Sequence, residues 1–183
     1  MSGMFRWLQR PTPIERLARH NLRPDTLAAA AAMVSDPRSD AQVIRLESSL
    51  RDSETVLQMV DARFEGEMGL LVLTSERVLF RARFSRGQLG FDVELGSIAA
   101  IEGSTRKVLG TVRLTTAEGG FTVDRILGNQ GETLAERARG AMRGDRPRRD
   151  PLELLAELRA LRDSGAISQS EFDERKAAVW GDI

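Results

Sequence analysis

The sequence contains no cysteine and no tyrosine, and His20 is its single histidine. The absence of cysteine excludes disulfides, thiolate metal sites and cysteine nucleophiles. To act as a general base, His20 would need a nucleophile and an orienting carboxylate, and its neighbours in the sequence supply neither. We therefore expect no catalytic, cofactor-binding or metal-binding residues, and a protein that is not an enzyme.

The sequence has 27 basic and 27 acidic residues, so neither sign of charge predominates. This balance gives no field that would attract nucleic acid, so we expect no nucleic-acid partner. The longest apolar run, residues 27–34, is far shorter than the about 20 residues that span a bilayer. Residues 1–10 lack the continuous apolar stretch of a signal peptide, and we expect a cytoplasmic location.

Apolar residues at helical spacing predict short amphipathic helices in an N-terminal segment, residues 1–52. Pro24 opens the second helix, and the Asp36-Pro37 pair closes it. Ser39 and Gln42 have the spacing of a capping box for the third. We expect these helices to pack on the domain that follows.

Near residue 55 the spacing of the apolar residues changes from every third or fourth position to every second position. Turn residues then recur every few positions, as in an all-β barrel or sandwich. The predicted strands span 55–63, 69–74, 77–84, 90–95, 97–102, 109–116 and 120–126. An amphipathic helix is predicted over 130–142. Residues 53–142 should thus form one domain of strands with a final helix.

The third predicted strand has the clearest alternation of side chains. Its inner face carries Val78, Phe80, Ala82 and Phe84, and its outer face carries Arg77, Arg81 and Arg83. Leu79 is the apolar exception on the outer face. Such a pattern predicts a strand with one face in the core and one in solvent.

The sixth and seventh strands offer a register to test. If residues 117–120 form a four-residue loop, pairing outward from Thr116 and Phe121 places Arg113 opposite Asp124. That exposed pair would contribute roughly 0.2–1 kcal/mol to the register. The same register would place Leu114 and Val123 on the inner face.

Residues 69–80, GLLVLTSERVLF, resemble the G-x-L-V-L-T-x-x-R-x-x-F hairpin of bacterial PH-like domains of the YokE-like and GRAM-like kind. The resemblance implies a seven-stranded β-barrel capped by a C-terminal helix. In PH domains that bind phosphoinositides, the loop between the first two strands is basic. Here residues 64–68 are Phe-Glu-Gly-Glu-Met, and this acidic loop argues against inositol phosphate at that position.

A charged linker over residues 143–150 precedes a C-terminal segment, residues 151–183. Asp150-Pro151 is typical of a helix start, Gly165 of a left-handed helix end, and Ser168 with Glu171 of a capping box. With the leucines before Gly165 and the E-F-x-x-x-K after it, the segment resembles the SHOCT domain. The resemblance implies a short helical hairpin with a role in oligomerisation or partner contact.

The predicted fold is therefore α+β, with N-terminal helices, a PH-like barrel and a helical hairpin, and the predicted function is an intracellular interaction module that binds a protein or small ligand. The alternative is a peripheral membrane protein that uses the Trp7 segment and the arginine face. The candidate anion or partner face comprises Arg77, Arg81, Arg83 and Arg86. The candidate assembly face, for self-association or a protein partner, comprises Leu155, Leu158, Leu161, Ile167, Phe172, Val179 and Trp180.

Overall fold

The computed structural model describes residues 13–33, 40–84, 89–144, 158–159, 161–163, 165 and 167–181. The chain divides into two compact units, Met1–Arg143 and Gly144–Ile183. The first unit contains the N-terminal helices, the whole sheet and the helix that follows it. The second contains the C-terminal hairpin with α6 (Gln169–Gly181).

The helices of the first unit begin and end near the predicted residues. They are α1 (Pro13–Leu17), α2 (Pro24–Ala31), α3 (Asp40–Glu47) and α4 (Gln130–Met142), with 3₁₀ turns η1 (Ala18–His20) and η2 (Leu95–Ser97). Pro24 stands at the start of α2, as predicted. The predicted partner of Gln42, Ser39, lies outside the described residues, and the Gln42 amide instead donates to the carbonyl oxygen of Arg81 at 3.0 Å.

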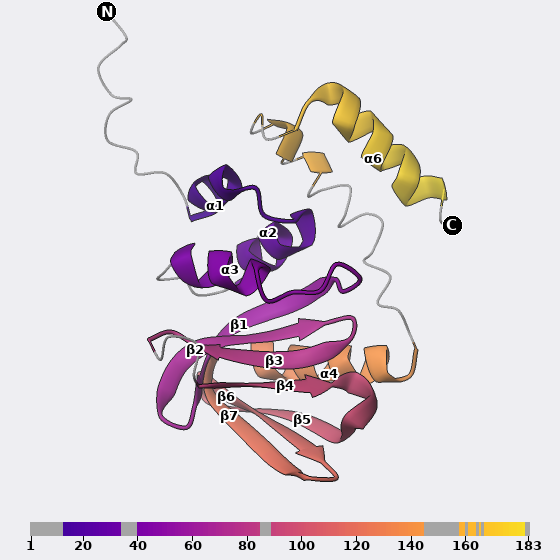
Figure 1. The fold of residues 1–183 in the computed structure, drawn as a ribbon. Helices are drawn as coiled ribbons and strands as arrows, with labels where there is room; N and C mark the ends of the chain where they lie inside the picture. Colours follow the sequence, from indigo (N-terminus) through magenta and orange to yellow (C-terminus); the bar gives the residue numbers. More distant parts are fainter. Residues whose placement is uncertain are drawn as a thin grey trace, which may run out of the picture. The chain divides into compact units, whose positions relative to one another are not determined.

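Seven antiparallel strands form the sheet, as predicted. They are β1 (Val56–Phe64), β2 (Glu67–Thr74), β3 (Arg77–Ala82), β4 (Gly90–Glu94), β5 (Ile98–Arg106), β6 (Leu109–Thr116) and β7 (Gly119–Leu127). Their order is β4-β3-β2-β1-β7-β6-β5, and α4 follows the last strand, which is the PH-like order (Figure 1). The expectation of a closed barrel is wrong, because β4 and β5 stand at the two ends of this order without pairing.

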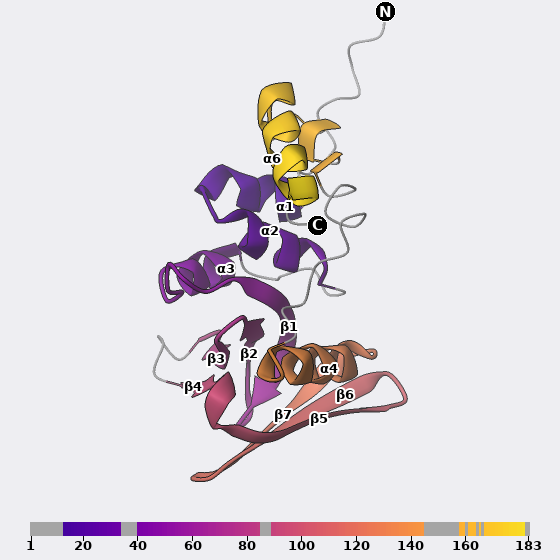
Figure 2. The same ribbon diagram turned by 90° about the vertical axis from the view of Figure 1, so that its right-hand side faces the viewer.

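The main core lies on the inner face of the sheet and is completed by α4. Phe80 of β3, Leu114 of β6 and Leu134 of α4 are all fully buried in it. Helix α4 reaches the sheet where β5 has Gly103, since a Cβ at Gly103 would lie 2.4 Å from the carbonyl oxygen of Gly131. Figure 2 shows α4 lying along the sheet beside β5 and β6. The helix therefore packs against β5 and β6 and closes the core on that side of the sheet.

A second core occupies the opposite face of β1–β3, which includes the outer face of β3 that the alternation predicted to be in solvent. Leu17 and Leu46 from the helices meet Met59, Val72 and Leu79 from the strands. All five side chains are at most 1 % exposed. The prediction of a wet outer face on β3 is therefore wrong, because α1, α2 and α3 cover it (Figure 1). Leu79, the apolar exception in the sequence, contacts these helices. Phe84, which was predicted on the inner face, instead lies beyond the end of β3 and is 77 % exposed.

The predicted register of β6 and β7 is also wrong. Arg113 faces Thr122 and Thr116 faces Gly119, so two residues rather than four separate the strands. Asp124 lies opposite Arg63 of β1, where its carboxylate accepts two hydrogen bonds from the guanidinium at 2.8 and 2.7 Å. This ion pair joins the β1–β4 and β5–β7 halves of the sheet.

Candidate interaction surfaces

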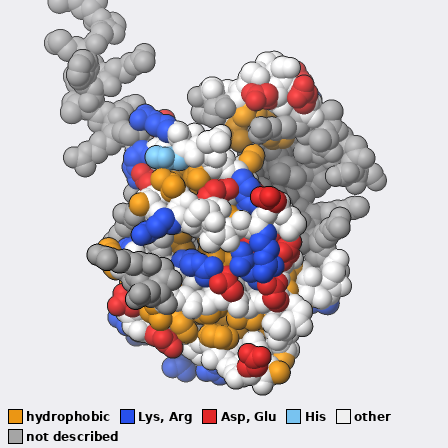
Figure 3. All heavy atoms as spheres, in the orientation of Figure 1, with side chains coloured by type: hydrophobic (Ala, Val, Ile, Leu, Met, Phe, Trp, Pro, Cys, Tyr) orange, Lys and Arg blue, Asp and Glu red, His pale blue; other side chains and the backbone are white. Residues whose placement is uncertain are grey.

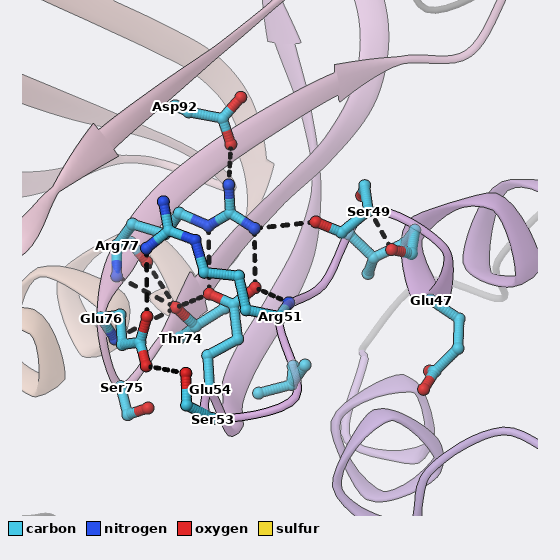
Figure 4. A network of polar contacts seen from close by, with 12 residues as sticks. Glu47, Ser49, Arg51, Ser53, Glu54, Thr74, Ser75, Glu76, Arg77 and Asp92 are labelled. Carbon is cyan, nitrogen blue, oxygen red and sulfur yellow. Dashed lines mark hydrogen bonds and ion pairs between the residues drawn. The ribbon is translucent and has the colours of Figure 1, made fainter.

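The predicted arginine face begins with Arg77, which lies at the centre of an internal polar network (Figure 4). Its guanidinium donates to both carboxylate oxygens of Glu54 at 3.0 and 2.7 Å. It also donates to Asp92 at 2.8 Å and to the carbonyl oxygen of Ser49 at 2.8 Å. Only 6 % of Arg77 is exposed, so this side chain is not available to an external anion.

Glu54 is the acidic partner of Arg77 and is itself buried. Its carboxylate also accepts hydrogen bonds from the Thr74 hydroxyl at 3.0 Å and the Arg51 backbone N–H at 2.8 Å. Burial acts to raise the pKa of Glu54, but the hydrogen bonds from Arg77, Arg51 and Thr74 outweigh it and hold the pKa below its ordinary value. The pair is therefore ionised and satisfied, and it fastens the 49–54 segment to β3.

Arg81 and Arg83 are also engaged with carboxylates of the same chain. Arg81 donates two hydrogen bonds to Asp92, at 2.9 and 2.8 Å. Arg83 donates to Asp61 at 3.2 Å and to the Gln42 amide oxygen at 3.3 Å. Arg77, Arg81 and Arg83 of the predicted face are thus all held in ion pairs within the chain. Figure 3 shows basic and acidic side chains next to one another on this side of the molecule.

Two pairs of carboxylates that are close in the sequence, Asp92 with Glu94 and Glu65 with Glu67, lie in different environments. Asp92 binds Arg77 and Arg81, and Glu94 accepts from Arg51 at 2.6 Å, so both are structural partners of arginines. Glu65 and Glu67 are exposed at the turn between β1 and β2. Across the described residues, no three carboxylate or histidine side chains gather closely enough to hold a metal ion.

An open depression of about 340 Å³ is lined by residues of β5, β6 and α4. These residues are Glu102, Gly103, Ser104, Thr111, Arg113 and Arg139. The strand register places Glu102 directly opposite Arg113, and Arg139 donates to the carbonyl oxygen of Ile101 at 2.8 Å. The lining thus carries both signs of charge and is open to water, which makes it a weak candidate for a specific ligand.

The C-terminal hairpin has the predicted local chemistry. Gly165 has a φ of +75°, and the N–H of Ile167 donates to the carbonyl oxygen of Leu161 at 3.3 Å. Both features are typical of the C-terminal end of a helix, here the first helix of the hairpin. The Ser168 N–H donates to Glu171 at 2.8 Å, and the Glu171 N–H donates to the Ser168 hydroxyl at 3.2 Å. The predicted capping box is therefore confirmed.

The candidate assembly face is only partly described. Leu158 and Phe172 are buried, while Leu161 and Ile167 remain half-buried. The Arg162 guanidinium lies 4.8 Å from the centre of the Phe172 ring. Leu155, Arg86 and Trp7 lie outside the described residues, as do the side chains of Val179 and Trp180.

The analysis of the sequence missed an exposed apolar group at the turn between β5 and β6. Val108, Leu109 and Leu127 are 66 %, 43 % and 39 % exposed. The sequence next to the turn could have indicated this group. Successive side chains of a strand point to opposite faces of the sheet, so two adjacent aliphatic residues beside a turn cannot both point into the core. Within the described part of the chain, no helix is long and apolar enough to cross a membrane.

Comparison with known protein families finds a similarity within the second unit. Residues 153–179 match the SHOCT family, the short C-terminal domain. No curated protein matches the chain. Among solved structures, the chain is similar to the Vps36 N-terminal PH domain, with 16 % identity and a TM-score of 0.43 over 52 % of this chain and 83 % of that one.

It is also similar to the C-terminal domain of an unknown protein from Leishmania infantum. There the identity is 18 % and the TM-score 0.36, over 50 % of this chain and 84 % of that chain. The chain thus combines a domain with PH-like strand order and, over residues 153–179, a segment that is similar to the short C-terminal domain.

Proposed function

We propose that the chain is a non-enzymatic interaction protein, in which the PH-like domain is a rigid scaffold and the C-terminal hairpin brings copies of the chain together. The observation that carries this proposal is the match of residues 153–179 to a small helical domain whose turn and cap are formed as that domain requires.

The size of the hairpin supports a role in assembly. Units below about 40 residues bury little apolar surface and usually need a metal, a disulfide or a partner. This chain has no cysteine to supply a disulfide. Leu161 and Ile167 keep part of their surface exposed, and covering such surface favours association.

The ion pairs of the first unit support the role of scaffold. Arg77, Arg81 and Arg83 hold Glu54, Asp92 and Asp61, so their charges fix β3 to the segment before β1, to β4 and to β1. We therefore do not assign them to an external anion. We expect a partner to bind at surfaces that these ion pairs do not occupy.

The assembly proposal predicts a particle heavier than the 20.3 kDa monomer. Light scattering of the full chain over a range of concentrations should give a mass that rises toward a dimer or higher assembly. Ile167→Asp should lower that mass, because a carboxylate cannot be buried in an apolar contact without cost. The matched control is Ser170→Asp, which adds the same charge at an exposed position of α6 and should leave the mass unchanged.

Circular dichroism of both variants should retain the helix signal and the thermal transition of the sheet. A full chain that stays monomeric at every concentration contradicts self-assembly. Equal effects of Ile167→Asp and Ser170→Asp also contradict it, because the effect would then follow from charge and not from the apolar face.

A further inference from the structure

Three exposed aliphatic residues, Val108, Leu109 and Leu127, lie at one end of β5–β7. In the strand register, Leu109 of β6 lies between Arg106 of β5 and Leu127 of β7. Val108 stands at the hairpin turn and has the largest exposed fraction of the three, 66 %. Exposed apolar side chains that are contiguous in this way mark interaction sites more often than single ones do.

Hydrogen bonds to the backbone hold the turn that carries these residues. The N–H of Gly128 donates to the carbonyl oxygen of Val108 at 2.9 Å, which ties the turn to the end of β7. The Thr105 hydroxyl donates to the carbonyl oxygen of Gly128 at 3.3 Å. Lys107 completes the turn with a φ of +56°. We name Arg106, Lys107, Val108, Leu109 and Leu127 the hairpin tip.

The charges of the hairpin tip are all positive. Arg106 and Lys107 are exposed, and no ion pair joins either of them to a carboxylate among the described residues. Arg51, Arg63 and Arg77 show the opposite behaviour, since each is bound to a carboxylate of the chain. The tip therefore presents cations that the fold itself does not neutralise.

The hairpin tip lies at the end of the sheet opposite the β1–β2 and β6–β7 turns, which carry exposed glutamates. The rings of Phe64 and Phe121 are 6.2 Å apart, which places the β1–β2 and β6–β7 turns at one end. Glu65, Glu67 and Glu118 belong to that end. The antiparallel order then places the β5–β6 turn at the opposite end, and Figure 2 shows this hairpin beneath α4.

We infer that the hairpin tip binds an anionic lipid surface. Val108 and Leu109 enter the boundary between headgroups and acyl chains, where aliphatic side chains lose contact with water. Arg106 and Lys107 stay at the level of the lipid phosphates, which complement their charge. This site differs from the arginine face and the Trp7 segment, and it does not depend on the C-terminal hairpin.

The observations favour lipid over a protein partner. A stable protein interface buries about 1,200–2,000 Å² in total, and three aliphatic residues at a turn supply only a small part of that. A second copy of the tip would bring Arg106 and Lys107 against their own equivalents, where like charges repel. A lipid surface requires neither a large flat area nor acidic residues on a partner chain.

Vesicle co-sedimentation of the full chain tests the inference. Vesicles of phosphatidylcholine with phosphatidylserine should bind the protein, and vesicles of phosphatidylcholine alone should bind it at least about tenfold less, because anionic lipid attracts the two cations. Raising the salt concentration should release the protein. Val108→Asp should reduce binding about tenfold, and so should Arg106→Gln combined with Lys107→Asn.

The matched control is Phe84→Asp, which places the same carboxylate on another strongly exposed side chain, 77 % exposed, beyond the end of β3. This variant should bind as the wild type does. The inference is overturned if vesicles with phosphatidylserine bind no protein, or if Val108→Asp and Phe84→Asp reduce binding equally. Light scattering of Val108→Asp should give the wild-type mass, which keeps this test separate from that of assembly.

Discussion

Replacing Glu54 by glutamine is expected to lower the free energy of unfolding by about 3–5 kcal/mol, the range seen when one partner of a buried ion pair is removed. The substitution preserves the size of the side chain but removes the charge that faces Arg77, which is only 6 % exposed. Asp92 and the carbonyl oxygen of Ser49 still accept hydrogen bonds from Arg77 in this variant. The lost stability therefore comes from the two hydrogen bonds to Glu54. Urea unfolding at neutral pH measures the change in the free energy of unfolding.

The matched control is Glu76→Gln, which makes the same chemical change in the same network. Glu76 pairs with Arg51, and both side chains are substantially exposed. The expected change in the free energy of unfolding is therefore at most about 1 kcal/mol. Equal losses in the two variants would contradict a special role for the buried pair.

The Glu54–Arg77 pair also predicts a dependence of stability on pH. The folded-state pKa of Glu54 is held below its ordinary value of 4.5. A carboxyl group with a depressed pKa contributes its full stabilisation above the unfolded pKa and loses it as the pH falls through the folded one. The wild type should thus lose more stability than Glu54→Gln when the pH falls below 4.5. Parallel losses would contradict the assignment to Glu54.

Replacing Phe80 by alanine is expected to lower the free energy of unfolding by about 3–5 kcal/mol, the cost of a large cavity in a closed core. The Phe80 side chain is fully buried on the inner face of β3. Its ring packs against Phe64 and Phe91, at centroid distances of 5.5 and 6.0 Å. Chemical denaturation of the full chain measures the change, and retention of the sheet signal in circular dichroism shows that the variant folds.

Arg81→Ala is the neighbouring control on the opposite face of β3. Arg81 binds Asp92 in a partly exposed ion pair, so its removal should cost at most about 1 kcal/mol. Comparable losses from Phe80→Ala and Arg81→Ala would mean that the inner and outer faces of β3 are assigned wrongly.

Local features of the chain were predictable because their causes lie within a few residues. The proline before α2, the period of two in β3 and the turn at Gly165 each depend on backbone geometry near that residue. The Ser168–Glu171 capping box spans three positions, and its two hydrogen bonds form as the spacing predicts. The succession of seven strands and a helix follows from the same local signals.

Contacts between distant residues were not predictable from the same patterns. Arg77 and Glu54 are 23 positions apart, and Arg63 and Asp124 are 61 positions apart. A charged residue on the outer side of a strand has the same alternation whether water or a layer of helices covers it. The sequence alone therefore suggested an exposed arginine face where the structure has internal ion pairs.

By itself, the sequence determined the elements, their order and the local chemistry of the hairpin, because secondary structure and caps depend on neighbours along the chain. The tertiary structure decided which charges are neutralised and which remain exposed. Helices α1–α3 cover the outer face of β1–β3, and the 49–54 segment that follows them holds the buried Arg77 beside Glu54. Strand pairing brings Leu109 and Leu127 together next to Arg106, since residues 18 positions apart meet only when the strands align.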